Sequence, residues 1–170
     1  MPTSYRVRVE HLYLSPGHNF FGHHGEKAAD HAMVEVDKAL CIAGRGIHGD
    51  RFFDYKKDYK GQVTFFSMEV FERVCHELHL VNLPPCIVRR NAFIRGVDLN
   101  LLVGHTFKLQ GVTFSGTEEC RPCYWMDEAL APGAEKLLAR CGGLRARILT
   151  DGHLKARDGD RNWSRMELES

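Results

Sequence analysis

The chain has 170 residues, of which 44% are hydrophobic and 26% are charged, and its formal net charge is +1. Such a length and composition are typical of one globular domain with its own core, and the balanced charge gives no reason to expect a nucleic-acid partner. Six cysteines are too few and too scattered for a disulfide-rich scaffold. Neither a signal-peptide pattern nor a membrane-spanning apolar run is found, so we predict a cytoplasmic protein with free thiols that binds no membrane.

The first part of the chain predicts two strands separated by a loop. Residues 5–14 alternate apolar and charged side chains, which predicts a strand, and Ser15-Pro16-Gly17 ends it. His18–His31 has no period and predicts a surface loop, whose histidines match no metal-binding spacing. Met33–Ile42 predicts a second strand, and residues 43–50 form a turn with three glycines.

The clearest predicted helix follows an irregular segment over residues 51–60. Gln62–Phe66 predicts a strand, and Ser67 directly after it is a typical N-cap. Apolar residues at helical spacing then extend from Val70 to Leu78, and together they predict one amphipathic helix. Leu83-Pro84-Pro85-Cys86 ends this helical pattern.

Short elements dominate the next part of the chain. Asn91–Gly96 predicts a short strand, and Asp98–Leu102 predicts a single helical turn. Thr106–Leu109 and Val112–Thr117 predict two further strands, which Gln110-Gly111 joins as a tight hairpin.

The last part predicts a helix, two strands and a polar tail. Ala134–Arg140 predicts a short helix that Gly142-Gly143 ends. Leu144–Leu149 alternates as a strand, and Asp151-Gly152 predicts a hairpin turn into His153–Lys155. The tail from Arg157 is polar and is expected to fray. Many short strands with few helices favour a mainly β, barrel-like fold, mostly antiparallel with two or three inserted short helices, in a single domain spanning residues 1–170.

The strongest candidate site is the turn that carries Cys120 and Cys123. A strand-like run precedes it and helix-forming residues follow it, so that a thiol can be aimed into a pocket near cations that favour the thiolate. Arg121 and Pro122, between the two cysteines, favour this functional interpretation. Spacing alone favours two buried structural cysteines, with a disulfide between them as a further alternative, and no second cysteine pair completes a zinc site.

Two further clusters have both a functional and a structural interpretation. Arg89-Arg90-Asn91 suits the binding of phosphate or carboxylate, but it could equally be a solvated basic edge. Gly46–Arg51, with His48, could bind an anion through backbone N–H groups, although a plain glycine-rich turn is the simpler interpretation. Glu118-Glu119 offers a general base or a solvated pair of carboxylates.

Taken together and in order, several of these motifs resemble the MOSC domain, the C-terminal domain type of molybdenum-cofactor sulfurases, in its stand-alone bacterial form. The resemblance covers about residues 32–155 and implies a mostly β, barrel-like fold with a pocket for a molybdopterin-type cofactor or for its sulfur. The motifs that carry it are Gly46–Arg51, Gln62–Glu69, Arg89–Asn91, Gly96–Leu99, Gly104, Cys120–Cys123, Asp127 and Gly142–Ala146.

The resemblance also implies roles for particular residues. Cys123 takes the place of the family's characteristic cysteine, which is a molybdenum ligand in some relatives and a proposed sulfur carrier in others. Arg90 and Asn91 take the place that contacts the anionic part of the cofactor, and Thr64 lies on the bordering strand. We add Arg121 and His48 as predicted cofactor-binding residues. Pyridoxal phosphate is not expected to bind, because the chain lacks a desulfurase domain.

Two functions follow from the resemblance as expectations. One is a molybdenum-dependent oxidoreductase that reduces N-hydroxylated small molecules, with Cys123 as catalytic residue and metal ligand. The alternative is a persulfide carrier or cofactor-delivery module without turnover of its own. The expected partners are a small-molecule substrate or a sulfur donor or acceptor protein, an electron-donor protein, and a second copy of the chain that completes the open side of the pocket as a homodimer.

Overall fold

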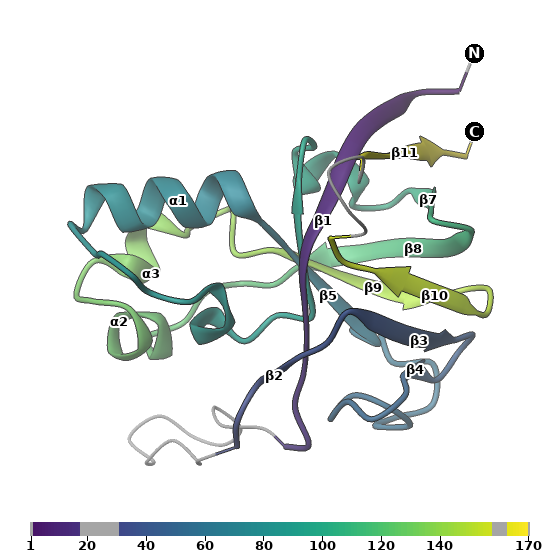
Figure 1. Cartoon of the computed structure of the whole chain (residues 1–170), viewed down its shortest axis with the longest axis horizontal. Helices are drawn as coiled ribbons and strands as arrows, with labels where there is room; N and C mark the ends of the chain where they lie inside the picture. The colour runs from purple at the N-terminus through teal and green to yellow at the C-terminus, as the bar shows by residue number, and fades with distance from the viewer. Residues whose placement is uncertain (1, 18–30, 158–162, 170) are drawn as a thin grey trace.

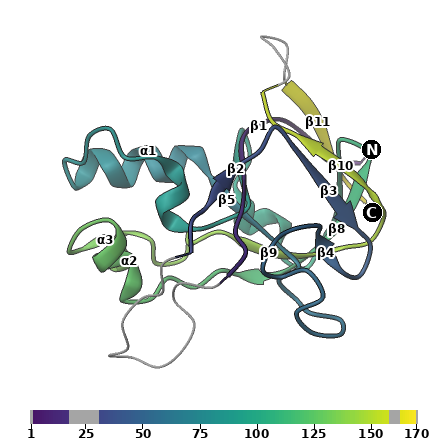
Figure 2. The same cartoon turned by 60° about the horizontal axis from the view of Figure 1, so that its bottom comes forward.

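The computed structural model describes residues 2–17, 31–157 and 163–169. Short strands alternate with a few helices, and the helices gather on one side of the strands in both views (Figures 1 and 2). The strands are β1 (Ser4–Leu14), β2 (Val34–Glu35), β3 (Lys38–Ile42), β4 (Gly46–Ile47), β5 (Val63–Ser67), β6 (Ala92–Arg95), β7 (Thr106–Leu109), β8 (Val112–Glu119), β9 (Leu144–Ile148), β10 (Gly152–Lys155) and β11 (Trp163–Leu168). The helices are α1 (Met68–Glu77), α2 (Trp125–Ala129) and α3 (Ala134–Leu137), with 3₁₀ turns η1 (Pro85–Val88) and η2 (Leu99–Leu102).

The main sheet closes into a barrel. Its strands follow the order β11-β7-β8-β9-β5-β6-β1, and β11 pairs back onto β1 to complete the ring. Every pairing in this ring is antiparallel except that between β5 and β6, which is parallel because α1 connects them. The prediction of a mainly β, mostly antiparallel, barrel-like fold with two or three short helices is therefore confirmed.

A smaller sheet of order β10-β3-β4 lies against the barrel (Figure 2). The predicted hairpin at Asp151-Gly152 is wrong, because β10 pairs with β3 rather than with the preceding β9. The Asp151 carboxylate accepts a hydrogen bond from the N–H of Ala43 at 2.7 Å, which ties the turn to the end of β3. A Cβ atom on Gly152 would lie 2.7 Å from the Val112 side chain, so glycine lets the chain cross close to β8.

The predicted fraying of the tail is also wrong where the structure describes it. Residues 163–168 form β11, which pairs antiparallel with both β1 and β7 and brings the two ends of the chain together (Figure 1). Met166 points into the barrel and is fully buried. A polar composition hid this strand, since one inward residue is enough to fix its register on a barrel edge.

Two other predicted elements differ in extent. The predicted strand over residues 33–42 is divided at Val36-Asp37, because β2 pairs with β1 while β3 pairs with β10. The predicted helix over residues 134–140 ends at Leu137. The predicted single turn over residues 98–102 and the long helix capped by Ser67 are confirmed, and the Ser67 hydroxyl accepts the N–H of Val70 at 3.2 Å. The predicted loop over residues 18–31 lies, except for its last residue, outside the described residues.

The core is divided between the inside of the barrel and the layer beneath the helices. Phe65, Phe107 and Phe114 fill the barrel with ring centroids 5.3 to 5.8 Å apart. Phe66, next in the chain, points the other way and packs with Phe93 under α1. Strand β5 is therefore buried on both faces, and this fixes the position of Thr64, which lies within the strand. Among the described residues, none of the helices has the length and apolar character needed to cross a bilayer.

Candidate functional site

The cysteine turn connects the end of β8 to the start of α2. The N–H of Cys120 donates to the carbonyl of Gly143 at 2.9 Å, and the carbonyl of Cys123 accepts the N–H of Met126 at the same distance. Residues 120–123, between these two anchors, form neither helix nor strand, and the two cysteines stand at the ends of this short segment. Cys120 is only 4% exposed, whereas Cys123 is half-buried.

Both thiols line one cavity of about 160 Å³. The cavity is rich in arginine and aromatic side chains, and none of its described lining residues is acidic. It is lined by Arg51, Phe52, Thr64, Arg89, Arg90, Cys120, Arg121, Cys123, Trp125, Met126 and Arg145. Of the predicted site residues, the structure thus brings together Cys123, Arg90, Thr64 and Arg121, whereas Asn91 and His48 lie elsewhere.

Two arginines of the lining are deeply buried. The Arg51 guanidinium lies 3.1 Å from the Asp50 carboxylate and donates to the carbonyl of Arg89 at 2.9 Å. Burial and the neighbouring Arg90 lower the pKa of Arg51 despite this ion pair. Burial, followed by the charge of Arg51, lowers the pKa of Arg89 to about 10. Their positive charges are therefore incompletely compensated, and an anion in the cavity would relieve the repulsion.

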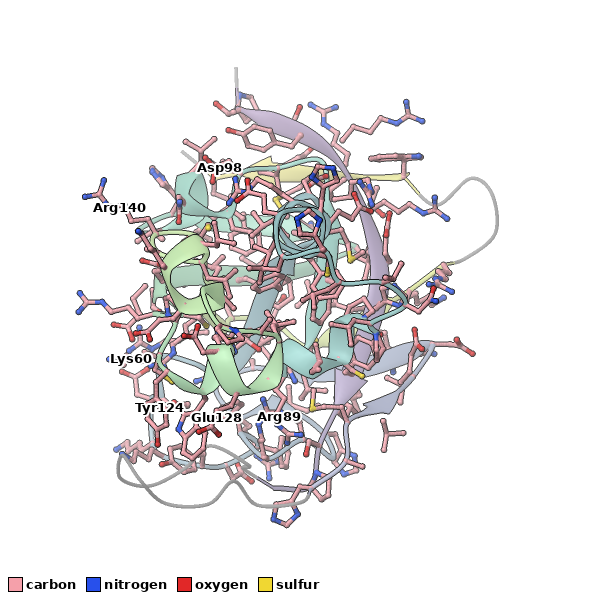
Figure 3. The ribbon with its side chains drawn as sticks, turned by 90° about the vertical axis from the view of Figure 1, so that its left-hand side faces the viewer. Lys60, Arg89, Asp98, Tyr124, Glu128 and Arg140 are labelled. Atoms are coloured by element: carbon pink, nitrogen blue, oxygen red, sulfur yellow. The ribbon has the colours of Figure 1, made fainter. Side chains whose placement is uncertain are left out.

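The backbone around Arg89 explains its position. Arg89 ends η1 with a positive φ of 54°, which turns the chain into β6. Its guanidinium donates to the carbonyls of His31 and Gly17 and to the hydroxyl of Ser15, at 2.6 to 2.9 Å. In Figure 3, Arg89 lies along the same edge of the molecule as Tyr124 and Glu128, at α2, while Asp98 lies at the opposite edge.

Arg90 is fixed by backbone oxygens. It donates to the carbonyl of Gly142 from two nitrogens, at 3.2 and 3.0 Å, and to the carbonyl of Val88 at 2.9 Å. Because these acceptors are neutral, the guanidinium keeps its full charge while its other N–H groups stay available to a ligand. The same Gly142 packs on the cysteine turn, so Arg90 and the thiols are held by one segment.

Arg145, on β9, lines the same cavity as the buried Cys120. It also donates to the Glu118 carboxylate at 3.0 Å. Burial by itself lowers the pKa of Arg145, but Cys120, Tyr59 and Glu118 together outweigh burial and raise it. The Glu118 carboxylate also pairs with Lys60 at 2.9 Å, and these contacts lower its pKa. This carboxylate is therefore suited to orient Arg145 rather than to act as a general base.

Asn91 has a structural position. It is fully buried, and its side-chain oxygen accepts the N–H and the hydroxyl of Thr64 at 3.0 and 3.1 Å. Its amide nitrogen donates to the carbonyl of Tyr13 at 3.2 Å, and its own backbone N–H donates to the Thr64 hydroxyl at 3.0 Å. Asn91 thus joins β1 to β5 and holds Thr64 in the cavity wall, while its predicted contact with a cofactor stays a prediction.

His48 stands apart from the cavity. It is exposed and lies edge-to-face with Phe53 at 5.5 Å. The glycine-rich turn that carries it is stabilised by ordinary backbone hydrogen bonds, as the simpler interpretation expects. Its role in cofactor binding therefore finds no geometric support, and it too stays a prediction.

The described residues contain neither a disulfide nor a metal cluster. All six cysteines lie among the described residues and are free, so the structure contains no disulfide between Cys120 and Cys123. Among all the residues that the structure describes, no three histidine, cysteine or acidic side chains converge as a metal cluster. Apart from His31, the histidine-rich loop predicted over residues 18–31 lies outside them.

Sequence reasoning missed part of this site. Arg51 and Arg145 belong to the motifs that carry the resemblance, but neither was chosen as a site residue. Phe52 and Trp125 were not chosen either, because nothing in the sequence distinguishes an aromatic residue at a cavity from one in a core. The sequence does hold a signal, at least one arginine in each of four separate motifs, and it becomes meaningful once the barrel places those motifs around one cavity.

The structure is thus a closed, mostly antiparallel barrel that carries two cysteines and several arginines around one cavity. The family model of the MOSC domain matches residues 23–161. The chain belongs to the MOSC domain family, which is associated with binding of the molybdenum cofactor.

Solved structures share this fold at low sequence identity. The YuaD protein of Bacillus subtilis is 18% identical with a TM-score of 0.72, and the alignment covers 100% of this chain and 99% of that one. YiiM of Escherichia coli is 16% identical with a TM-score of 0.62 and coverages of 99% and 71%. YiiM of Geobacillus stearothermophilus is 10% identical with a TM-score of 0.63 and coverages of 96% and 75%. A search of curated proteins found no match.

Proposed function

We propose that this MOSC protein binds a pterin-type molybdenum cofactor at the arginine-lined cavity and reduces N-hydroxylated small molecules, with Cys123 as the molybdenum ligand. The observation that carries the proposal is that the Cys123 thiol and the arginines, Arg90 among them, line the same cavity. A thiolate is a soft ligand that suits molybdenum, and arginine is the preferred partner of phosphate.

The donor set fits such a cofactor, although the cavity is small. Its volume of about 160 Å³ is below the roughly 300–1,000 Å³ of ordinary small-molecule sites. The cavity therefore encloses part of a pterin cofactor, and the remainder lies outside it. We propose that the protein forms a homodimer in which a second copy of the chain covers this remainder.

The residues of the chain have separate roles in this proposal. When bound, the cofactor supplies the redox chemistry, and an electron-donor protein supplies the electrons. Arg89 and Arg90 hold the anionic end. The Thr64 hydroxyl, whose proton is donated to Asn91, offers a ligand an acceptor lone pair. Cys123 is only half-buried, so a substrate can approach its sulfur.

Metal and pterin analysis tests this function. Protein purified from a host that makes the cofactor should contain molybdenum and pterin in near-equal amounts, and Cys123→Ala should lose both the metal and the reduction of N-hydroxylated compounds. Cys75→Ala, at a partly buried cysteine outside the cavity, is the matched control and should retain both. Protein from this host that is free of metal and pterin would contradict the proposal.

A second candidate function is a persulfide carrier. The small volume of the cavity and its second thiol favour this alternative, because a persulfide needs far less room than a pterin. Incubation with a cysteine desulfurase and its substrate should add one sulfur atom to Cys123, as measured by mass spectrometry. The absence of added sulfur at every cysteine would rule it out.

A further inference from the structure

Cys120 differs from the other deeply buried cysteine of the chain. Cys41 lies in the barrel core at 0% exposure, where burial raises the pKa of its thiol to about 12. Cys120 is nearly as inaccessible at 4% exposure, but it lines the same cavity as Arg51 and Arg145. Cys120 is therefore a thiol among guanidinium groups, and not a small hydrophobic residue in a core.

The wall of the cavity around Cys120 carries arginine side chains. Cations next to a cysteine stabilise the thiolate, which is the form that attacks sulfur. The Asp50 and Glu118 carboxylates are each paired with one of the arginines of the cavity, at 3.1 and 3.0 Å. The interior thus presents arginine donors to any molecule that reaches Cys120, and an anion is the class of molecule that they attract.

The size of the cavity limits this molecule. A volume of about 160 Å³ is well below the roughly 300–1,000 Å³ of sites that hold drug-sized ligands. A small oxyanion fits this space, whereas a peptide segment or a whole nucleotide does not. Because Cys120 is otherwise sealed, a reagent reaches it through the cavity and must suit that cavity in charge and size.

We propose that Cys120 is a second sulfur-accepting thiol, which takes sulfane sulfur from a small anionic donor of the thiosulfate class. The Cys120 thiolate attacks the outer sulfur of thiosulfate. A new sulfur–sulfur bond forms on Cys120, the sulfur–sulfur bond of thiosulfate breaks, and sulfite leaves with the bonding electron pair. Arg51 and Arg145 stabilise the charge of the donor and of the departing sulfite.

This inference rests on the sulfur-carrier function and adds to it a second cysteine and a class of donor. The two can be tested separately. Transfer from a desulfurase to Cys123 tests the carrier function, whereas transfer from thiosulfate to Cys120 tests the inference. A protein that accepts sulfur from the desulfurase on Cys123 but takes none from thiosulfate on Cys120 would overturn the inference alone.

The experiment uses reduced wild-type protein incubated with thiosulfate, trapped with iodoacetamide and mapped by tandem mass spectrometry, which separates Cys120 from Cys123 by fragmentation. We expect one added sulfur on Cys120 and an equal amount of sulfite. Cys123→Ser should keep this uptake, and Cys120→Ser should lose it. Added sulfur on Cys123 alone, or undiminished uptake by Cys120→Ser, would overturn the proposal.

Charge variants test the role of the arginines. Arg145→Gln should slow the uptake about tenfold, since it removes a cation from the wall of the cavity that Cys120 lines. Arg147→Gln is the matched control on the same strand; Arg147 pairs with Asp58 and lies outside the cavity lining, so its rate should stay within about twofold of wild type. Equal rates in the two variants would overturn the proposal.

A second measurement needs no variant. Iodoacetate and iodoacetamide have similar size and differ in charge, so the ratio of their alkylation rates reports the local potential at each thiol. This ratio should be about tenfold higher at Cys120 than at Cys75, which is partly buried and has no cation among the groups that shift its pKa. The same ratio at both cysteines would contradict an anion-selective route to Cys120.

Discussion

The carbonyl oxygen of Cys120 lies 2.1 Å from the position that a Cβ atom would occupy on Gly142. The ring of Pro122 lies 3.0 Å from the same point, so both the backbone and a side chain of the cysteine turn press on this glycine. Two nitrogens of Arg90 also bind the carbonyl of Gly142. One glycine thus sets the distance between the thiol turn and the cationic wall of the cavity.

We therefore expect Gly142→Ala to displace the turn. A real Cβ cannot stand within 3.0 Å of a backbone oxygen, and overpacking of this kind costs about 1–3 kcal/mol of unfolding free energy. Urea unfolding measures this loss, and thiol alkylation measures the changed exposure of Cys120. Gly44→Asn is the control, because no atom lies within 4 Å of its Cβ position and asparagine tolerates the φ of 74°. An equal effect at both glycines would contradict the close packing.

The hydrogen bonds between Thr64 and Asn91 predict different losses of stability for two substitutions of Thr64. Thr64→Val leaves the N–H and the side-chain oxygen of Asn91 without the hydroxyl that pairs with both, in a fully buried position. An unpaired buried polar group costs about 1–3 kcal/mol, so chemical denaturation should show a loss of that size. Thr64→Ser keeps the hydroxyl and should lose less than about 1 kcal/mol. Similar losses in both would mean that these hydrogen bonds contribute little.

Because of Arg89, we expect anion binding to weaken at alkaline pH. The protonated guanidinium favours a bound anion, and burial holds its pKa at about 10, well below the ordinary value for arginine. The affinity for sulfate, whose charge is constant in this range, should therefore be steady below pH 9 and weaken as the pH passes about 10. Calorimetric titration of the Cys120→Ser, Cys123→Ser double variant excludes the thiols from this effect. An affinity that stays constant up to pH 11 would contradict the role of Arg89.

Closure of the barrel depends on Met166. This side chain is fully buried on β11, and truncation of a buried methionine to alanine costs about 2–5 kcal/mol. Met166→Ala should therefore lower the midpoint of urea unfolding strongly. Trp163, on the same strand, is 37% exposed with Arg6 above its ring, so Trp163→Ala should cost less. A larger loss at Trp163 than at Met166 would contradict the closed ring.

The sequence predicted the elements whose signal is local. The helix that begins after Ser67 carries its own cap and its own apolar face, and the glycine-rich turn of residues 43–50 needs no distant partner. The hairpin at Gln110-Gly111 has the same property, since its turn residues fix the pairing of β7 with β8. Such features can be recognised before the fold is known.

The features that depend on contacts between residues far apart in the chain could not be predicted from the sequence. Whether β10 pairs with β9 or with β3 is decided by the crossing at Gly152 and Val112, and the strand at residues 163–168 gains its place from β1 and β7. For the same reason, Cys123 could be chosen from its motif and its resemblance, whereas Arg145 could not. Arg145 shares a cavity with Cys120 because β8 and β9 are paired.

The central claim, that Cys123 provides a sulfur ligand to molybdenum, is tested most directly by X-ray absorption at the molybdenum edge of the cofactor-loaded protein. The sulfur coordination number should fall by one in Cys123→Ser and stay unchanged in Cys120→Ser. If wild type and Cys123→Ser show the same number of sulfur neighbours at the same distances, Cys123 is not a molybdenum ligand and the claim is contradicted.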